Sequence, residues 1–280
     1  MPITIASGAA ERSEAEALFE FHAAAPTAIQ AALGMNRTRL GGGIVTSMAH
    51  DTTSYWNKAL GFGDTAPVTE DLLAEIIAFY RAEKAPTAVI QIAPSQLPAD
   101  WPELCARHGL REGAPWLKLA APVEEVVARA GDENDSTLSC GPLPPGDAVQ
   151  WGTVMMRAFG MPEPLYSELA AGTATGHENW HPHAVWLGSE LVGTGTLAVR
   201  DGIGQMFGGA VLPHARQRGG QTALLGARAQ MAQKLGCTWL VAETGAEGPG
   251  EHNSSLHNML RLGFIVQYER PNWIWTPDQS

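Results

Sequence analysis

Apolar positions along the chain recur with helical spacing in some segments and form short β-branched runs in others. Over residues 69–83 the apolar side chains fall three or four apart, the spacing of a helix with one buried face. The run 87–92 is short and β-branched and predicts a strand, whereas residues 101–108 predict a helix that ends at Gly109. Such alternation predicts an α/β fold.

The remaining segments extend this pattern over the whole chain. They predict a helix over 11–32, strands at 39–48 and 116–119, a strand near Leu138, a helix over 147–158, a Gly- and His-rich loop at 172–182, and strands at 183–187, 191–199 and 203–212. The polar, unpatterned stretch 131–136 is the best candidate for a linker. Both halves share a loose order of strand, helix, strand, helix, strand, which suggests a duplication. We therefore expect two domains, 1–130 and 131–280.

Composition narrows the possible partners. A net charge of −11 disfavours nucleic acid and anionic membranes, because both repel an acidic surface. Three widely spaced cysteines, Cys105, Cys140 and Cys237, argue against a disulfide framework or a zinc site. No stretch is long and apolar enough to span a membrane, and no basic start followed by an apolar run opens the sequence. We expect a cytoplasmic protein.

The segment 211–222 carries the clearest chemical signal. It leaves a strand, turns at Pro213, and enters a helix through Arg216, Arg218 and Gly219-Gly220. Glycine lets the backbone approach an anion, free amides of a first helical turn point at it, and arginine adds charge-assisted hydrogen bonds. This order suits a pyrophosphate, and a glycine-rich turn with solvated arginines is the alternative.

Two motifs together resemble the GNAT superfamily of N-acetyltransferases. The run from Val211 to Leu225 is similar to that family's coenzyme A loop, although Gln221 stands where a small residue is usual. Downstream, residues 253–264 resemble the later helix of the family, which starts near an Asn and ends in Leu-Gly-Phe. The resemblance covers residues 136–280. It implies a mixed, mostly antiparallel sheet flanked by helices, with two such domains in tandem.

The same resemblance implies how acetyl-CoA, the co-substrate, is held. The strand before the loop splays from its neighbour, and the backbone of Gly209, Ala210 and Val211 binds the pantetheine arm. Asn253 and Asn258 are candidates for the pantetheine or sulfur end, with a helix cap and a surface amide as the respective alternatives. The pyrophosphate is assigned to the loop residues Arg216, Gln217, Arg218, Gly219, Gly220, Gln221 and Thr222.

The implied reaction is direct attack of a primary amine on the acetyl thioester, with a small-molecule or peptide amine as acceptor. Glu243 is the candidate base, acting through water, and pairing with an arginine or capping the strand is its alternative role. The later helix lacks the tyrosine that many members use as acid, and Tyr166 and Tyr268 are distant in sequence, so the acid stays unassigned. A non-catalytic acyl-CoA sensor is the rival hypothesis. A homodimer remains open.

Residues His177 to His181 spell HExxH, the pattern of zinc proteases. Gly176 before it and Pro182 after it argue against the helix this motif requires. We therefore expect no metal site and a polar loop that lies near an acceptor entrance.

The first 130 residues lack a comparable anion site. Before the helix at Thr69, the stretch 63–67 contains no arginine and no second glycine. We expect this half to be a degenerate copy of the same fold that packs on the catalytic half and shapes the acceptor pocket.

Overall fold

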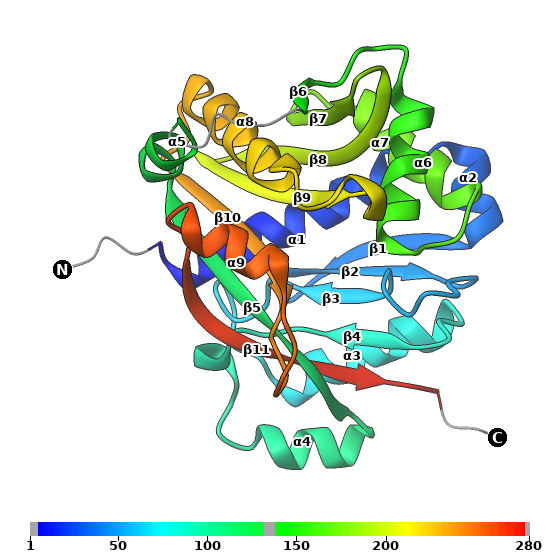
Figure 1. Ribbon diagram of the computed structural model, residues 1–280. Helices are drawn as coiled ribbons and strands as arrows, with labels where there is room; N and C mark the ends of the chain where they lie inside the picture. Colours follow the sequence, from blue (N-terminus) through cyan, green and yellow to red (C-terminus); the bar gives the residue numbers. More distant parts are fainter. Residues whose placement is uncertain (1–4, 132–137, 278–280) are drawn as a thin grey trace.

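In the part of the chain that the structure describes, eleven strands form one continuous sheet in the order β1-β2-β3-β4-β11-β5-β10-β9-β8-β7-β6. The computed structural model describes residues 5–131 and 138–277, and Figure 1 shows helices on both faces of the sheet. The first half contributes α1 (Ser7–Ala23), α2 (Thr27–Leu33), β1 (Met35–Leu40), β2 (Gly43–Met48), β3 (Lys58–Leu60), α3 (Glu70–Ala82), β4 (Ala88–Ile90), α4 (Trp101–His108), β5 (Arg111–Pro122) and α5 (Val123–Gly131). The second half contributes β6 (Ser139–Pro142), α6 (Ala148–Phe159), α7 (Leu165–Gly176), β7 (Trp180–Leu187), β8 (Glu190–Arg200), β9 (Ile203–Val211), α8 (Gly220–Lys234), β10 (Trp239–Gly245), α9 (Ser254–Arg261) and β11 (Ile265–Trp275).

One order of elements occurs twice along the chain. Two helices, a three-stranded antiparallel meander, a helix, a strand parallel to the meander's last strand, a further helix and a long strand follow one another in each half. The repeat runs from α1 to β5 and from α6 to β11, and β6 is an addition at the outer edge of the second half. The duplication suggested by the sequence pattern is therefore visible in the order and direction of the strands.

The last strand of each repeat is inserted into the other half. β11 lies between β4 and β5, and β5 lies between β11 and β10, with all of these neighbours antiparallel. Figure 1 shows the two long strands crossing the middle of the molecule side by side. Because each half needs the other's strand to continue its sheet, the two halves form a single hydrogen-bonded structure.

Helix α1 packs across both halves. Its neighbours include β2 and β3 of the first half and β9 and β10 of the second. A core cluster likewise joins Phe21 and Trp56 to Trp151 and Trp180 from the second half, and the rings of Phe21 and Trp56 stack with centroids 4.9 Å apart. Helix α1 also buries the charged side chains Glu11, Glu14 and Glu20. This helix therefore brings carboxylates into the interior of the molecule, where cations from later strands can meet them.

Several segments differ from the sequence prediction. The predicted helix 11–32 is two helices that break before Pro26, because proline lacks the N–H that a helix interior needs. The predicted strand 39–48 is a hairpin, β1 and β2, turned at Gly41 and Gly42, and helix α5 lies in a stretch that the pattern left unassigned. The predicted linker begins where α5 ends, and residues 132–137 lie outside those described. The predicted loop 172–182 is the end of α7 and the start of β7.

No helix in the described part of the chain is long and apolar enough to cross a membrane. The three cysteines are free, as expected from their spacing. Predicted helices 69–83 and 101–108 agree with α3 and α4, whose ends are Thr69 as N-cap and Gly109 as a left-handed C-cap.

Candidate active site

Strands β9 and β10 begin as neighbours and then diverge. They pair in parallel only over residues 203–205 and 239–241, although β9 continues to Val211 and β10 to Gly245. A bulge at Gly208 and Gly209, where Gly208 has φ +60°, interrupts the pairing of β9 with β8 in the same region. The edge of β9 that faces β10 is therefore unpaired beyond Gln205. Such an edge can hydrogen-bond to an extended ligand as an added strand does.

A cavity of about 390 Å³ opens at this divergence. From the second half it is lined by the bulge of β9, by Glu243 and Thr244 of β10, and by Met155 and Met156 of α6. From the first half it is lined by Glu14 and Leu18 of α1 and by Tyr55, Trp56, Lys58, Leu60 and Trp116. Both halves therefore build one site. The residues from the first half are far away in sequence and were missed as site residues, although Lys58, a lone lysine at the start of the short buried strand β3, was a detectable signal.

The predicted anion loop forms the turn between β9 and α8. Gln217 and Gly219 have φ values of +61° and +77°, and Gly219 is the N-cap of α8. The first-turn amides of Gly220, Gln221 and Thr222 have no partner within the helix, whereas the Ala223 amide bonds to the Gly219 carbonyl. A Cβ on Gly220 would lie 3.0 Å from Leu138, so glycine lets α8 start close against the sheet.

The two arginines of the loop lie differently. Arg216 turns back onto the protein, where its Nε donates to the Val211 carbonyl at 3.0 Å and its Nη2 donates to the Ala158 carbonyl at 3.4 Å. Arg218 is exposed and has no ion-pair partner among the described residues. Gln221 lines the cavity and donates to the Gly209 carbonyl at 3.4 Å. Arg218 is therefore free to reach an anion, whereas Arg216 holds the turn in shape.

The two candidate asparagines, Asn253 and Asn258, also differ in the hydrogen bonds that they make within the protein. Asn253 is the N-cap of α9: its Oδ1 accepts from the amides of Ser255 and Leu256, and its Nδ2 donates to Thr244 Oγ1 and the Gly245 carbonyl, both at 2.8 Å. Its polar atoms are thus used within the protein, as the capping alternative requires. Asn258 is half-buried, and its Oδ1 accepts from Arg261 at 2.7 Å.

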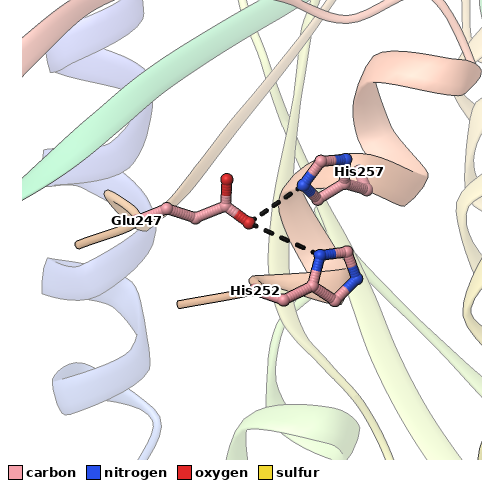
Figure 2. A group of neighbouring side chains, drawn as sticks. All are labelled: Glu247, His252 and His257. Atoms are coloured by element: carbon pink, nitrogen blue, oxygen red, sulfur yellow. Dashed lines mark hydrogen bonds and ion pairs between the residues drawn. The ribbon is translucent and has the colours of Figure 1, made fainter. Parts of the chain in front are cut away.

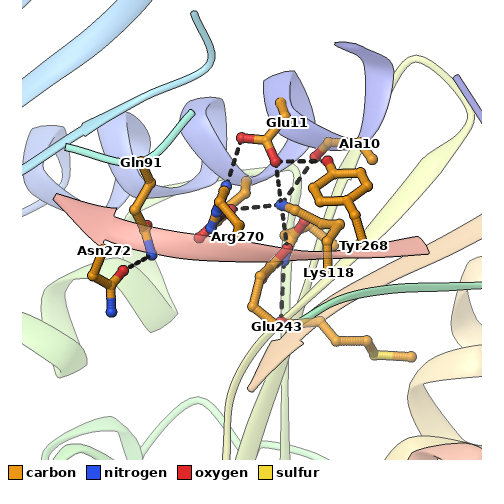
Figure 3. A network of polar contacts seen from close by, with 11 residues as sticks. Ala10, Glu11, Gln91, Lys118, Glu243, Tyr268, Arg270 and Asn272 are labelled. Atoms are coloured by element: carbon orange, nitrogen blue, oxygen red, sulfur yellow. Dashed lines mark hydrogen bonds and ion pairs between the residues drawn. The ribbon is translucent and has the colours of Figure 1, made fainter. Parts of the chain in front are cut away.

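Glu243 lies inside a buried network of charges (Figure 3). Its Oε1 is 2.7 Å from Lys118 Nζ, and its Oε2 accepts from Gln205 Nε2 at 2.7 Å. Burial, together with the nearby Glu14 carboxylate, raises the pKa of Glu243 to about 7, and Lys118 partly opposes that rise. A carboxyl group of this kind exchanges protons near neutral pH while lining a cavity, which is what a general base requires.

The other members of the network fix the position of Lys118. Its ammonium lies 2.5 Å from Glu14 Oε2, and Arg270 bonds to Glu14 at 2.8 Å and to Glu11 at 2.5 Å. Burial alone would raise the pKa of Glu14, but Arg270 and Lys118 override it and hold that pKa at about 2. Glu14 therefore remains ionised, and its negative charge helps to keep Glu243 easily protonated.

Lys58 is a second titratable group on the cavity wall. Its Nζ lies 3.8 Å from the ring centroid of Tyr55 and 4.7 Å from that of Trp116. Burial lowers the pKa of Lys58 to about 8, against the pull of Glu14. Its side chain makes no ion pair within 4 Å among the described residues, so its ammonium is held chiefly by aromatic faces.

Arg228 of α8 is buried behind the β9 bulge. Its guanidinium donates to the carbonyls of Leu224 and Thr196 at 3.0 and 3.2 Å. Burial lowers the pKa of Arg228 to about 10. A Cβ on Gly195 would lie 2.9 Å from Arg228 Cζ, and one on Gly209 would lie 3.0 Å from its Nη2, so both glycines make room for the guanidinium. The arginine thus supplies donors where the bulge interrupts the sheet.

The tyrosines considered from sequence lie elsewhere. Tyr268 donates to Glu11 at 2.7 Å, and Tyr166 donates to Asp51 at 3.3 Å. Neither lines the cavity. The HExxH stretch runs from the C-cap of α7 into β7, so His177 and His181 do not share a helical face.

The corresponding turn of the first half, after β3, has a different character. A Cβ on Gly63 would lie 2.4 Å from the Gln96 side chain, and the adjacent Asp64 pairs with Arg12. An acidic, filled turn of this kind offers no cradle for phosphate.

Solved structures resemble this chain over most of its length. A GCN5-related N-acetyltransferase from Kribbella flavida superposes with a TM-score of 0.64 at 15% identity, covering 97% of both chains. One from Sphaerobacter thermophilus has a TM-score of 0.57 at 16% identity, covering 83% of this chain and 80% of its own. A tandem GNAT protein from the clavulanic acid biosynthesis pathway, solved without AcCoA, has a TM-score of 0.56 at 13% identity, covering 97% of both chains. No protein-family model and no curated protein sequence matches the chain.

These likenesses define the fold class. The chain has a tandem GNAT fold, a mixed and mostly antiparallel sheet flanked by helices, in which two repeats share one sheet. The fold expected from the loop at 211–225 and the helix at 253–264 is thereby confirmed. At such identities a likeness speaks to the fold, and the activity rests on the chemistry of the cavity.

Proposed function

We propose that the protein transfers an acetyl group from acetyl-CoA to a primary amine. The observation that carries this proposal is the meeting of three features at one cavity. These are the unpaired edge of β9, the anion loop before α8, and a carboxyl group with a pKa near neutrality, Glu243. The Gly209–Val211 backbone then holds the pantetheine arm, and the first-turn amides from Gly220 to Thr222, with Arg218, hold the pyrophosphate.

In this proposal Glu243 removes a proton from the acceptor amine, directly or through a water molecule. The amine nitrogen forms a bond to the thioester carbon, and the bond between that carbon and sulfur breaks. Backbone N–H groups freed by the bulge at Gly208 and Gly209 can donate to the carbonyl oxygen as it gains negative charge. Glu243 can act near neutral pH because burial raises its pKa to about 7.

Lys58 is our candidate for the acid that the sequence left unassigned. The departing thiolate needs a proton, and a thiol has a pKa of about 8.5. Lys58, with a pKa lowered to about 8, is matched to that group, lines the same cavity and carries a positive charge that stabilises a thiolate. Tyr55 lines the cavity too, but burial raises its pKa well beyond that of a thiol, so its proton transfer is less favourable.

The first half of the chain shapes the acceptor end of the cavity in this proposal. Tyr55, Trp56 and Trp116 supply aromatic faces, and Glu14 supplies a fixed negative charge. Aromatic walls favour an acceptor with an apolar body, because binding removes that apolar surface from water. The favoured acceptor is therefore a small amine with an aromatic or aliphatic body.

Two measurements on the full chain test the proposal. Acetyl-CoA should raise the melting temperature, since a ligand at 100 times its Kd adds about 2.7 kcal/mol of stability. A panel of small amines should then include at least one that releases CoA in proportion to acetylated product, read by thiol detection and mass spectrometry. A shift in melting without turnover on any amine would favour the acyl-CoA sensor. No shift at millimolar acetyl-CoA would reject both.

A further inference from the structure

Three possible metal-ligating side chains converge on the loop between β10 and α9. Glu247 Oε1 lies 2.9 Å from His257 Nε2 and 3.8 Å from His252 Nδ1. The two imidazole rings stack with centroids 4.4 Å apart, and both turn a nitrogen toward the carboxylate (Figure 2). All three ligand atoms lie within 4.8 Å of one another, and within the described residues no other group of three or more His, Cys, Asp and Glu side chains converges in this way.

The surrounding loop holds this arrangement in place. Asn253, between the two histidines, caps α9 and ties the helix start to Thr244 and Gly245 at the end of β10. Glu251 closes the loop from the other side, since its carboxylate accepts from the Gly248 amide at 3.1 Å. The ligand atoms are therefore held by a fixed backbone, which lowers the entropy lost when an ion binds.

We propose that Glu247, His252 and His257 bind one divalent transition-metal ion of the Zn²⁺ type. Zinc bonds to histidine nitrogen at about 2.0–2.1 Å and to carboxylate oxygen at about 2.0–2.2 Å, so its tetrahedral ligands lie about 3.3 Å apart. The distances from Glu247 Oε1 to the two histidine nitrogens, 2.9 and 3.8 Å, lie on either side of that value. Shifts of less than 1 Å in these exposed side chains would bring both distances to it. Two imidazoles and one carboxylate also match the ligand preference of such ions.

The site is open to solvent. The His252, His257 and Glu247 side chains are 69%, 48% and 26% exposed, so an ion can enter without unfolding the protein. Three protein ligands leave a fourth position for water. A bound ion would also cross-link the loop between β10 and α9, and the flanking residues Gly245 and Ser255 line the cavity. Sequence spacing gave no signal of this site, because Glu-x4-His-x4-His fits no regular helix or strand.

The test is a Zn²⁺ titration of chelator-stripped full-length protein against a competing chromophoric chelator. We expect one Zn²⁺ per chain, with affinity reduced at least about tenfold by each of His252→Ala, His257→Ala and Glu247→Gln, since loss even of a ligand's supporting hydrogen bond costs 10–100-fold. The three variants should melt like the parent without metal, because the positions are exposed. Zn²⁺ should also slow amide exchange over residues 246–253 in the parent alone.

Two matched controls guard against binding at other histidines. His214 forms a pair with Glu190 at 3.2 Å on the surface but has no second imidazole, so His214→Ala should leave the titration unchanged. His177→Ala should do the same, because the HExxH stretch is divided between a helix and a strand. The proposal is overturned if no Zn²⁺ binds, or if binding survives both His252→Ala and His257→Ala.

Discussion

Lys118 and Arg270 occupy equivalent positions on the two exchanged strands, and both place their cation on one carboxylate oxygen, Glu14 Oε2. Lys118 is paired with Tyr268, and Arg270 with Trp116, so the local two-fold relation between β5 and β11 interchanges the two cations. The distances to Glu14 are 2.5 and 2.8 Å. Helix α1, through Glu14, thus contacts both exchanged strands, β5 and β11.

Glu14 makes folding stability sensitive to acid. Its pKa is about 2 in the folded protein and 4.5 as a free side chain, so the unfolded state binds more protons between these values. Stability from this group is complete above pH 4.5 and is lost as the pH falls toward 2. Glu14→Gln should cost about 3–5 kcal/mol at neutral pH, because it leaves two buried cations short of a carboxylate. Urea unfolding at several pH values should show that the free energy of unfolding falls less between pH 4.5 and 2 in Glu14→Gln than in the parent. Exposed Glu103→Gln is the control.

Glu243→Gln should lower turnover by about 10²–10⁴, the usual contribution of a general base. Its affinity for acetyl-CoA should stay within about twofold of the parent's, since the carboxyl group acts on the amine. In the parent, kcat/KM should rise with pH through about 7, where Glu243 loses its proton, and the variant should lose that limb. A retained limb would assign Glu243 to a purely structural role.

Lys58→Met should remove the decline of activity above about pH 8, where the ammonium of the parent loses its proton. The parent should therefore show a narrow optimum between about 7 and 8, set by Glu243 and Lys58. Turnover of the variant should fall by about 10², the lower end for acid catalysis, because a thiolate is already a good leaving group. Exposed Lys234→Met is the matched control. If both variants kept the alkaline decline, Lys58 would not be the acid.

Arg218→Ala should weaken acetyl-CoA binding by about 1.5–3 kcal/mol, the value of a charge-assisted hydrogen bond, without altering the melting temperature of the free protein. Arg216→Ala should weaken acetyl-CoA binding and also lower the melting temperature of the free protein, because Arg216 holds the turn through the Val211 and Ala158 carbonyls. Gly219→Val should weaken binding further, since a β-branched residue is strained at φ +77°. Calorimetry and melting curves separate these effects, with Arg107→Ala, far from the loop, as control. If all four variants bound acetyl-CoA with the same affinity, the loop would not be part of the binding site.

The shared sheet should make unfolding a single transition. Ile77→Ala in the first half and Leu240→Ala in the second should each cost about 2–5 kcal/mol as cavity-forming changes. Both should lower the same denaturation midpoint, whether followed by tryptophan fluorescence or by circular dichroism. Two separable transitions, each shifted by one variant alone, would show that the halves fold independently.

Local signals in the sequence were sufficient for the helices with clear ends and for the turn between β9 and α8. Thr69 and Gly109 mark helix boundaries by capping chemistry, and the order Pro213, Arg216, Gly219 marks a strand-to-helix turn. Gly172, where the sequence predicts the start of a loop, lies within α7, and a Cβ there would meet Pro26 Cδ at 2.7 Å. Its role is close packing, which a local pattern cannot reveal.

The ion-pair partners of Glu243 could not be predicted for a related reason. Lys118 and Glu243 are 125 residues apart, and Lys118 and Glu14 are 104 apart, so their contacts depend on which strands pair. The exchange of β5 and β11 is a choice between nearly equivalent partners that hydrophobic patterning does not distinguish. Local pattern alone therefore cannot distinguish Glu11 and Glu14 from solvated residues of an alanine-rich helix.

The exchanged strands also set the order in which the protein can be completed during synthesis. While the ribosome is still adding residues before 265, β4 and β5 have no strand between them, because β11 spans 265–275. Both of the facing backbone edges stay open over that interval, and open edges can pair with other chains. Glu11 and Glu14 must likewise wait for Arg270. The first half is thus synthesised first, but its sheet is completed last. A stop codon anywhere in β11 would leave the sheet of both halves incomplete.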